Sequence, residues 1–163
     1  MWRLNRPDDA PPSVVATTQH LVVAPAVDVD LRNAMAAANH LVDSSPPPVA
    51  TFTGDLLPDW YDEWVVLERE RFRQVRLHAL EAICRAQTAA GRFPQAIEAG
   101  LAAVDGDPFR ESAHRVLIEV HLAEGNRFEA IRGYDRFRDM LRSEIGVEPS
   151  PLMDALLEQA RGA

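Results

Sequence analysis

The stretch Gly91-Arg92-Phe93-Pro94-Gln95-Ala96-Ile97 decides how this chain folds, because it returns 34 residues later as Gly125-Asn126-Arg127-Phe128-Glu129-Ala130-Ile131. The glycine, the alanine and the isoleucine are the same in both copies. Glycine adopts the left-handed backbone angle at a helix C-terminus without steric cost, and a small alanine lets the next helix pack closely. Pro94 suits the first turn of the returning helix, where no N–H donor is needed. The two stretches therefore predict two helical hairpins.

A repeat of this length is the period of the tetratricopeptide (TPR) helical hairpin. Such a unit hides its apolar face only by stacking on a neighbouring pair of helices. Asp107-Pro108 is expected to close the first hairpin, and Pro149-Ser150-Pro151 to begin a third unit with Ser150 as its cap. We expect a mainly α fold of two repeats and a capping helix. Proteins built in this way usually bind other macromolecules.

Composition limits the classes of protein to which this chain can belong. The 163 residues have a formal net charge of −8, which argues against wrapping nucleic acid over the whole surface. Cys84 is the single cysteine and cannot form an internal disulfide, which favours a reducing environment. Apolar stretches are too short to cross a bilayer, and no signal peptide is visible. We therefore expect a cytoplasmic protein without a membrane partner.

The first third of the chain predicts a small β-hairpin and a helix. Residues 1–6 are expected to be a helix remnant, and residues 14–18 and 20–23 two short strands, because they are rich in β-branched side chains. Asp30 can cap a helix over residues 31–42. The apolar stripe of that helix comprises Leu31, Met35, Ala38 and Val42. Because a two-stranded ribbon is marginal alone, we expect the hairpin to pack on this helix and on the long helix after Trp60.

Ser44-Ser45-Pro46-Pro47-Pro48 ends the 31–42 helix, and we interpret it as a stiff spacer rather than as a ligand for an aromatic groove. A long helix follows, reaching Ala90. Its first apolar stripe comprises Trp64, Leu67, Phe72, Val75, Ala79 and Ile83, and its second comprises Leu77, Leu80 and Cys84. Gly100 and Gly133 are expected where helices pack closely.

Catalysis is the weaker interpretation of the carboxylates Asp59, Asp62 and Glu63, although they lie beside Trp60 and Trp64 as in sugar-cleaving clefts. The helix dipole accounts for acidic residues in a first turn, and aromatic residues there would anchor the helix to the core. We therefore expect no enzyme.

Histidine spacing does not indicate a metal site. His114 and His121 are seven residues apart, not the four that place two ligands side by side on a helix. The sequence also lacks a phosphate-binding glycine loop. We therefore expect neither a metal nor a cofactor.

The chain resembles the bacterial transcriptional activator domain, the TPR-like C-terminal half of the actinobacterial antibiotic regulatory protein (SARP) family. Four motifs carry the resemblance, in the family's order: Gly54-Asp55-Leu56-Leu57-Pro58-Asp59-Trp60, Glu70-Arg71-Phe72-Arg73-Gln74, Asp107-Pro108-Phe109-Arg110-Glu111-Ser112-Ala113-His114-Arg115 and Gly146-Val147-Glu148-Pro149-Ser150-Pro151. The resemblance implies that residues 54–163 form this domain.

The N-terminal third is similar to the end of the family's winged-helix DNA-binding domain. Met1-Trp2-Arg3-Leu4 resembles the close of the recognition helix, and residues 14–23 resemble the wing, with Gln19-His20 where the family usually has Gly-Tyr. The resemblance implies a partial winged helix over 1–27, and a connecting helix with a Pro-rich linker over 28–53. The helices that precede Met1 in the family have no counterpart here. We therefore expect DNA binding by this chain to be impaired or absent.

In the family, the winged helix binds direct repeats in a promoter, and the helical domain self-associates and engages RNA polymerase. The resemblance thus implies a transcriptional regulator whose partners are RNA polymerase or another regulator, promoter DNA and a second copy. The alternative is a stand-alone TPR-like module that modulates a partner regulator without binding DNA. Candidate partner contacts are Arg110, Arg115, Arg127 and Arg132; candidate DNA contacts are Arg3, Arg6, Thr17, Thr18 and His20.

Overall fold

Helices make up most of the computed structural model, which describes residues 12–39 and 46–162. A two-stranded hairpin precedes them. In chain order the elements are β1 (Val14–Ala16), β2 (Leu21–Val23), α1 (Asp30–Asn39), the 3-10 helix η1 (Val49–Phe52), α2 (Glu63–Ala89), α3 (Phe93–Gly106), α4 (Glu111–Glu124), α5 (Arg127–Glu144) and α6 (Pro151–Arg161). The expected mainly α fold with a small N-terminal hairpin is confirmed.

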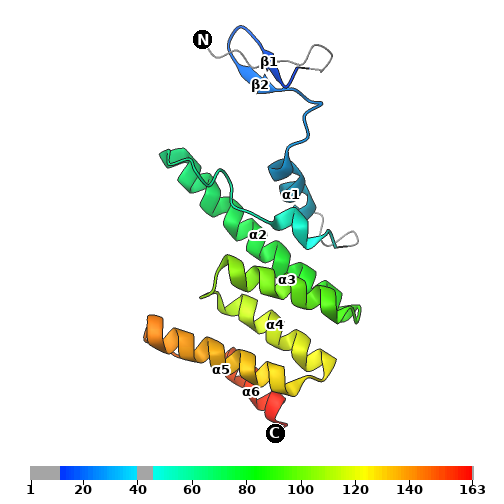
Figure 1. The fold of residues 1–163 in the computed structure, drawn as a ribbon, viewed down its shortest axis with the longest axis vertical. Helices are drawn as coiled ribbons and strands as arrows, with labels where there is room; N and C mark the ends of the chain where they lie inside the picture. The colour runs from blue at the N-terminus through cyan, green and yellow to red at the C-terminus, as the bar shows by residue number, and fades with distance from the viewer. Residues whose placement is uncertain (1–11, 40–45, 163) are drawn as a thin grey trace.

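The long helices stack in sequence order along the longest dimension of the molecule (Figure 1). α2 and α3 form one antiparallel hairpin, joined at Gly91, and α4 and α5 form the next, joined at Gly125. Both glycines have left-handed backbone angles, with φ of 69° and 86°. α6 packs on α4 and α5. The two repeats and the capping helix predicted from the 34-residue period are therefore present.

Two apolar clusters hold the stack together. The first lies among α1, η1, α2, α3 and α4 and includes Phe72, Leu80, Ile83, Cys84 and Val116. The second lies among α4, α5 and α6 and includes Ile118, Tyr134, Phe137, Leu141 and Met153. α4 contributes to both clusters, because Val116 and Ile118 lie on different faces of it. The position of α4 therefore sets how the two repeats meet.

The α1 helix and η1 complete the first cluster with the buried side chains of Ala34 and Phe52. The expected stripe of α1 is confirmed at Leu31, Met35 and Ala38, which pack against this cluster. α1 ends at Asn39 in the described part of the chain, and Val42 lies outside the described residues.

The hairpin forms as predicted, with β1 antiparallel to β2 and Val15 opposite Val22. The predicted packing of this hairpin on the helices is wrong: among the described residues, neither strand contacts a helix. A turn from Ala24 to Val27 leads the chain away, so the hairpin lies beyond α1 (Figure 1). Leu21 and Val22 are exposed as a result. The predicted helix remnant over residues 1–6 lies outside the described residues.

The first apolar stripe predicted for α2 is only half buried in the protein. Phe72, Ala79 and Ile83 are buried, but the side chains of Trp64 and Leu67 are 58% and 71% exposed. α2 has 27 residues and α3 only 14, so α3 covers the C-terminal half of α2 and leaves about 20 Å of its length to other neighbours. The predicted burial of this stripe is therefore wrong for Trp64 and Leu67, which lie before Phe72.

Gly100 and Gly133 offer a matched test of close helix packing. A Cβ added to Gly100 would lie 3.1 Å from Leu117 Cδ1, whereas one added to Gly133 would lie 3.4 Å from Ile118 Cγ1. Alanine is favoured over glycine in a helix interior by up to about 1 kcal/mol. We expect Gly133→Ala to raise the free energy of unfolding by about that amount, and overpacking to cancel or reverse the gain in Gly100→Ala. Urea denaturation measures both; a Gly100→Ala variant as stable as Gly133→Ala would contradict the packing described.

Candidate functional site

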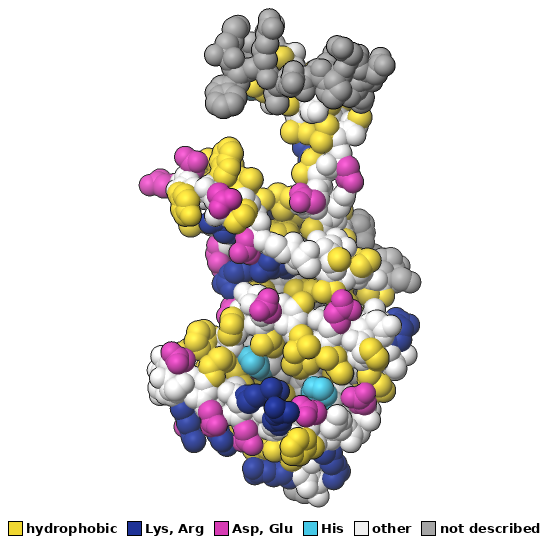
Figure 2. Space-filling model, viewed as in Figure 1, with side chains coloured by type: hydrophobic (Ala, Val, Ile, Leu, Met, Phe, Trp, Pro, Cys, Tyr) yellow, Lys and Arg dark blue, Asp and Glu magenta, His cyan; other side chains and the backbone are white. Residues whose placement is uncertain are grey.

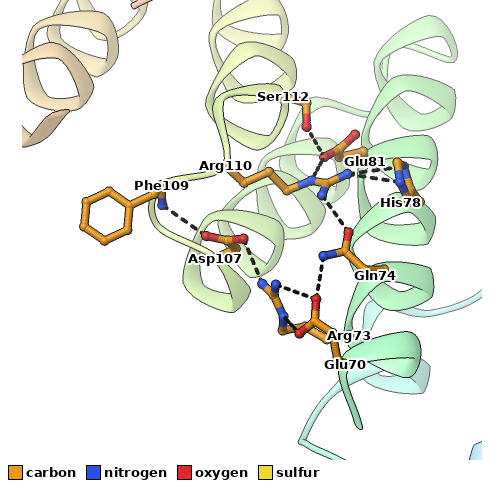
Figure 3. Close-up of polar contacts among 9 residues, drawn as sticks. All are labelled: Glu70, Arg73, Gln74, His78, Glu81, Asp107, Phe109, Arg110 and Ser112. Carbon is orange, nitrogen blue, oxygen red and sulfur yellow. Dashed lines mark hydrogen bonds and ion pairs between the residues drawn. The ribbon is translucent and has the colours of Figure 1, made fainter. Parts of the chain in front are cut away.

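The carboxylate of Glu81 is the centre of a polar cluster between α2 and the segment that leads into α4 (Figure 3). Its side chain is 3% exposed. Its Oε1 atom accepts hydrogen bonds from Arg110 Nε and from Ser112 Oγ, both at 2.6 Å. Arg85 lies 3.7 Å from the second carboxylate oxygen. The cluster therefore provides a buried charge with the opposite charge and the donors that it requires.

The guanidinium of Arg110 is turned toward α2 (Figure 3). Its Nη1 atom donates to Gln74 Oε1 at 3.1 Å, and its Nη2 atom lies 3.3 Å from both ring nitrogens of His78. The side chain is only 16% exposed. Arg110 thus contacts residues on successive turns of α2 and holds the start of α4 against that helix.

The same segment is tied to α2 a second time through Asp107. Arg73 donates to Asp107 Oδ2 at 2.8 Å and, through two nitrogens, to both carboxylate oxygens of Glu70 at 2.9 Å. These hydrogen bonds from Arg73, with a further one from Gln74, lower the pKa of Glu70 to about 2. Asp107 Oδ1 also accepts from the backbone N–H of Phe109. The loop between α3 and α4 is therefore fixed at its first residue as well as at Arg110.

Glu111, the next residue, fixes the start of α6. Its carboxylate accepts hydrogen bonds from the backbone N–H of Ser150 at 2.8 Å and from the Ser150 hydroxyl. Ser150 occupies the N-cap position, as predicted, but its side chain makes no capping hydrogen bond to its own helix. The predicted role is corrected because the charged carboxylate of Glu111 is the stronger acceptor for that hydroxyl. The Asp107–Ser112 motif thus joins α2, α4 and α6.

The four arginines predicted to contact a partner do not lie together. Arg110, a candidate that would need an exposed guanidinium to contact a partner, is instead paired inside the protein with Glu81. Arg115 is partly buried, 4.0 Å from Glu119. Arg127 and Arg132 are exposed in the first turns of α5, at the opposite end of α4 from Arg110. Arg132 pairs with Glu129 at 3.4 Å. A role in partner binding stays a prediction for all four residues.

The described DNA-contact candidates lie at the tip of the hairpin and are exposed. The hydroxyl of Thr17 donates to the His20 carbonyl at 3.1 Å and accepts from the His20 N–H at 2.9 Å, so it shapes the turn. Thr18 follows it in the same turn. Arg3 and Arg6 lie outside the described residues. DNA contact by any of these residues stays a prediction.

The projecting end of α2 and the residues before it carry a group of exposed large side chains, three aromatic and one aliphatic. We call this group the aromatic end: Trp60, Tyr61, Trp64 and Leu67. Their exposed fractions are 52%, 83%, 58% and 71%. The two indole rings meet edge to face, with centroids 6.4 Å apart. Figure 2 shows hydrophobic side chains gathered at this projection, with acidic ones beside them.

Arg69 holds the aromatic end in place. Its guanidinium donates to the carbonyl oxygens of Leu56 at 2.8 Å and of Trp60 at 2.9 Å, and also to that of Leu57. The backbone that carries Trp60 is thus attached to α2 although its side chains are exposed. A surface whose backbone is already fixed is suited to binding, because less ordering is needed when a partner arrives.

The sequence predicted that Trp60 and Trp64 anchor the helix to the core, and that interpretation is wrong. The signal that could have revealed the surface is the unequal length of the two helical patterns, 27 residues against 14 in the structure. An apolar stripe with no partner helix is left exposed, and exposed apolar patches of this kind mark interaction sites.

The structure places the carboxylates of Asp59, Asp62 and Glu63 in exposed positions. Within residues 12–39 and 46–162, no group of three or more His, Cys, Asp or Glu side chains could hold a metal ion. In the same part of the chain, none of the helices combines the length and the apolar character needed to span a membrane.

Residues 28–161 match the family model of the bacterial transcriptional activator domain. No curated protein matches the chain. The matched range contains the whole helical stack from α1 to α6 and excludes β1 and β2.

The buried charge of Glu81 can be tested by a change that preserves its size. Glu81→Gln leaves Arg110 facing a neutral partner in a buried site, so we expect the free energy of unfolding to fall by about 3 kcal/mol. The control is Glu68→Gln on the same helix, whose exposed partner Arg71 is 3.9 Å away and whose effect should be under about 0.5 kcal/mol. Urea denaturation compares them; equal losses would show that Glu81 is not the centre of the cluster.

His114 should give the protein a dependence on pH. It stacks on Phe137, and its Nε2 atom lies 2.8 Å from the Pro108 carbonyl oxygen; burial lowers its pKa below 6.5. His114 therefore binds a proton more readily in the unfolded chain. The contribution of neutral His114 to the free energy of unfolding is fully present above about pH 7 and is lost as the pH falls below about 6.5. We expect His114→Gln to weaken the fall in the urea midpoint between pH 7.5 and pH 5.5.

The matched control is His20→Gln, in the exposed turn of the hairpin, which should keep the wild-type difference between the two pH values. An undiminished difference in His114→Gln would remove His114 as its source.

Proposed function

This chain belongs to the bacterial transcriptional activator domain family, and from that premise we propose that it regulates transcription as a protein of the antibiotic regulatory protein (SARP) type. We propose further that its helical stack acts by self-association and by contact with RNA polymerase in the cytoplasm. Residues 54–163 would be the effector domain, residues 28–53 the connecting helix and linker, and residues 1–27 part of a winged helix. The proposal depends most on one observation, the aromatic end of α2.

The aromatic end supports a protein partner on physical grounds. Tryptophan and tyrosine are enriched at protein interfaces and among the few residues that carry most of the binding energy. Trp60, Tyr61 and Trp64 are each more than half exposed, and Arg69 fixes the backbone beneath them. Nothing in the helical stack requires these side chains, because the core begins at Phe72 on that stripe. Their exposure is explained if a partner covers them.

Charge indicates what kind of surface would fit the aromatic end. Asp59, Asp62, Glu63 and Glu68 are exposed around it, and the basic Arg69 is occupied by backbone carbonyls. A partner surface with an apolar centre and a basic rim would meet both features. Promoter DNA would be repelled there, because phosphates and these carboxylates carry the same charge.

DNA contact is the weaker part of the proposal. The resemblance of residues 14–23 to a wing assigns the hairpin to DNA, and its tip residues Thr17, Thr18 and His20 are exposed. Residues 12–27 contain no lysine or arginine, although phosphate contacts come largely from these residues. We therefore propose that DNA binding by this chain is impaired or absent.

A second candidate function follows from the lack of lysine and arginine in the hairpin. An acidic chain with a net charge of −8 and a hairpin without basic residues is suited to act on a partner regulator without touching DNA. The chain would then be an interaction module that modulates the regulator. Both candidates use the aromatic end, but only the first requires RNA polymerase.

We expect fluorescently labelled chain to bind RNA polymerase holoenzyme, measured by anisotropy. Trp64→Ala should weaken binding at least tenfold, because truncating a central tryptophan at an interface commonly costs 2 kcal/mol or more. The matched control is Phe128→Ala, which removes an aromatic side chain that is 72% exposed in the first turn of α5 and should leave binding unchanged.

Each outcome of this experiment has a distinct meaning. Thermal melts of both variants should match the wild type, because both side chains are exposed. Binding that Trp64→Ala does not weaken would contradict the role of the aromatic end. No binding to the polymerase would remove the first candidate. Salt-sensitive binding to a labelled promoter duplex would contradict the proposed impairment of DNA binding.

A further inference from the structure

A groove of about 260 Å³ lies between α3, α4 and α5, away from the aromatic end. Its volume is slightly below the roughly 300–1,000 Å³ of pockets that hold drug-sized ligands. Figure 2 shows histidine and basic side chains lying among hydrophobic ones on this face. The apolar residues that line the groove are Leu101, Val104, Leu117, Ile118, Phe137 and Met140.

Gly133, on α5, is one of the residues that line the groove. Gly133 has no side chain to fill the space, and a Cβ there would lie 3.4 Å from Ile118 Cγ1. Leu101, on α3, is 53% exposed although it borders this concave surface. An apolar ligand in the groove would remove such side chains from water, at roughly 25 cal/mol for each Å² buried.

Arg136 is the charged residue that lines the groove. Within the described part of the chain, its guanidinium has no acidic partner, whereas its neighbours on α5, Arg132 and Arg138, pair with Glu129 and Asp135. An unpaired cation at the edge of an apolar groove favours a ligand that is both apolar and negatively charged. Carboxylates suit a guanidinium best, because they accept two parallel hydrogen bonds from it.

His121 adds a second donor to the same groove. Its Nδ1 atom is buried, has no hydrogen-bond partner among the described residues, and lies 4.0 Å from Glu124 Oε2. In the tautomer with its proton on Nε2, the ring offers an N–H donor to a ligand in the groove. His114 differs, because its Nε2 atom is already engaged with the Pro108 carbonyl.

We propose that this groove binds a small apolar carboxylic acid. The apolar part would lie against Leu117, Phe137 and Met140, and the carboxylate would accept hydrogen bonds from Arg136 and from His121 Nε2. The volume limits the ligand to about the size of a bicyclic aromatic acid. Because α4 and α5 both line the groove, a bound ligand would contact both helices of the second repeat and stabilise their packing. This inference does not depend on the proposed function.

The probe is 2-naphthoate, with neutral 2-naphthamide as its isosteric control, titrated into the full chain by isothermal titration calorimetry. We expect one saturable site for the acid and binding at least fivefold weaker for the amide. Arg136→Gln should weaken naphthoate binding about tenfold, the worth of one charge-assisted hydrogen bond, and leave the amide unaffected. Arg136 is exposed, so the variant should fold normally.

The matched control is Arg132→Gln, one turn earlier on α5, which removes a paired arginine that does not line the groove and should leave the affinity unchanged. Amide NMR shifts on adding naphthoate should cluster at Ile118 and Gly133. Absence of saturable binding, equal affinity for acid and amide, unchanged affinity in Arg136→Gln, or shifts outside α3, α4 and α5 would each overturn the proposal.

Discussion

The buried pair of Glu81 and Arg110 is the interaction on which the rest of the structure depends. A carboxylate that is 3% exposed requires an opposite charge and hydrogen-bond donors, and Arg110 and Ser112 supply them from the start of α4. Asp107, nearby, is tied to Arg73, and Glu111 to Ser150. A short motif therefore sets where α4 lies against α2 and where α6 begins. Both the second apolar cluster and the groove between α4 and α5 follow from that position.

Unequal helix length is the second constraint. α3 is about half as long as α2, so the repeat that α2 begins cannot cover its own first helix. α1 and η1 cover part of the remainder and bury Phe72, but not Trp64 or Leu67. The aromatic end is thus a geometric consequence of the stack, and Arg69 keeps it ordered.

The arginines of this protein differ in whether acidic side chains of other elements lie within reach. Arg73 and Arg110 are structural, because their donors are used by side chains of other elements. Arg136 has no such partner among the described residues, although Arg132 and Arg138 on the same helix are paired. Residue type alone does not separate these roles, and the difference lies in which acidic side chains each guanidinium can reach.

The sequence by itself determined the helical repeats, the glycine turns at Gly91 and Gly125, the capping helix after Pro149 and the existence of the hairpin. These features depend on local backbone chemistry and on the periodicity of apolar residues within one element. Both can be recognised from residues that are close together in the sequence. Only the tertiary structure decided that Trp64 is exposed, that Arg110 is internal and that Ser150 binds Glu111. Arg110 pairs with Glu81, 29 positions away, and Ser150 binds Glu111, 39 positions away. The exposure of Trp64 depends on the length of a different helix, α3. Burial and pairing are set by what packs opposite a side chain, and no local pattern contains that information.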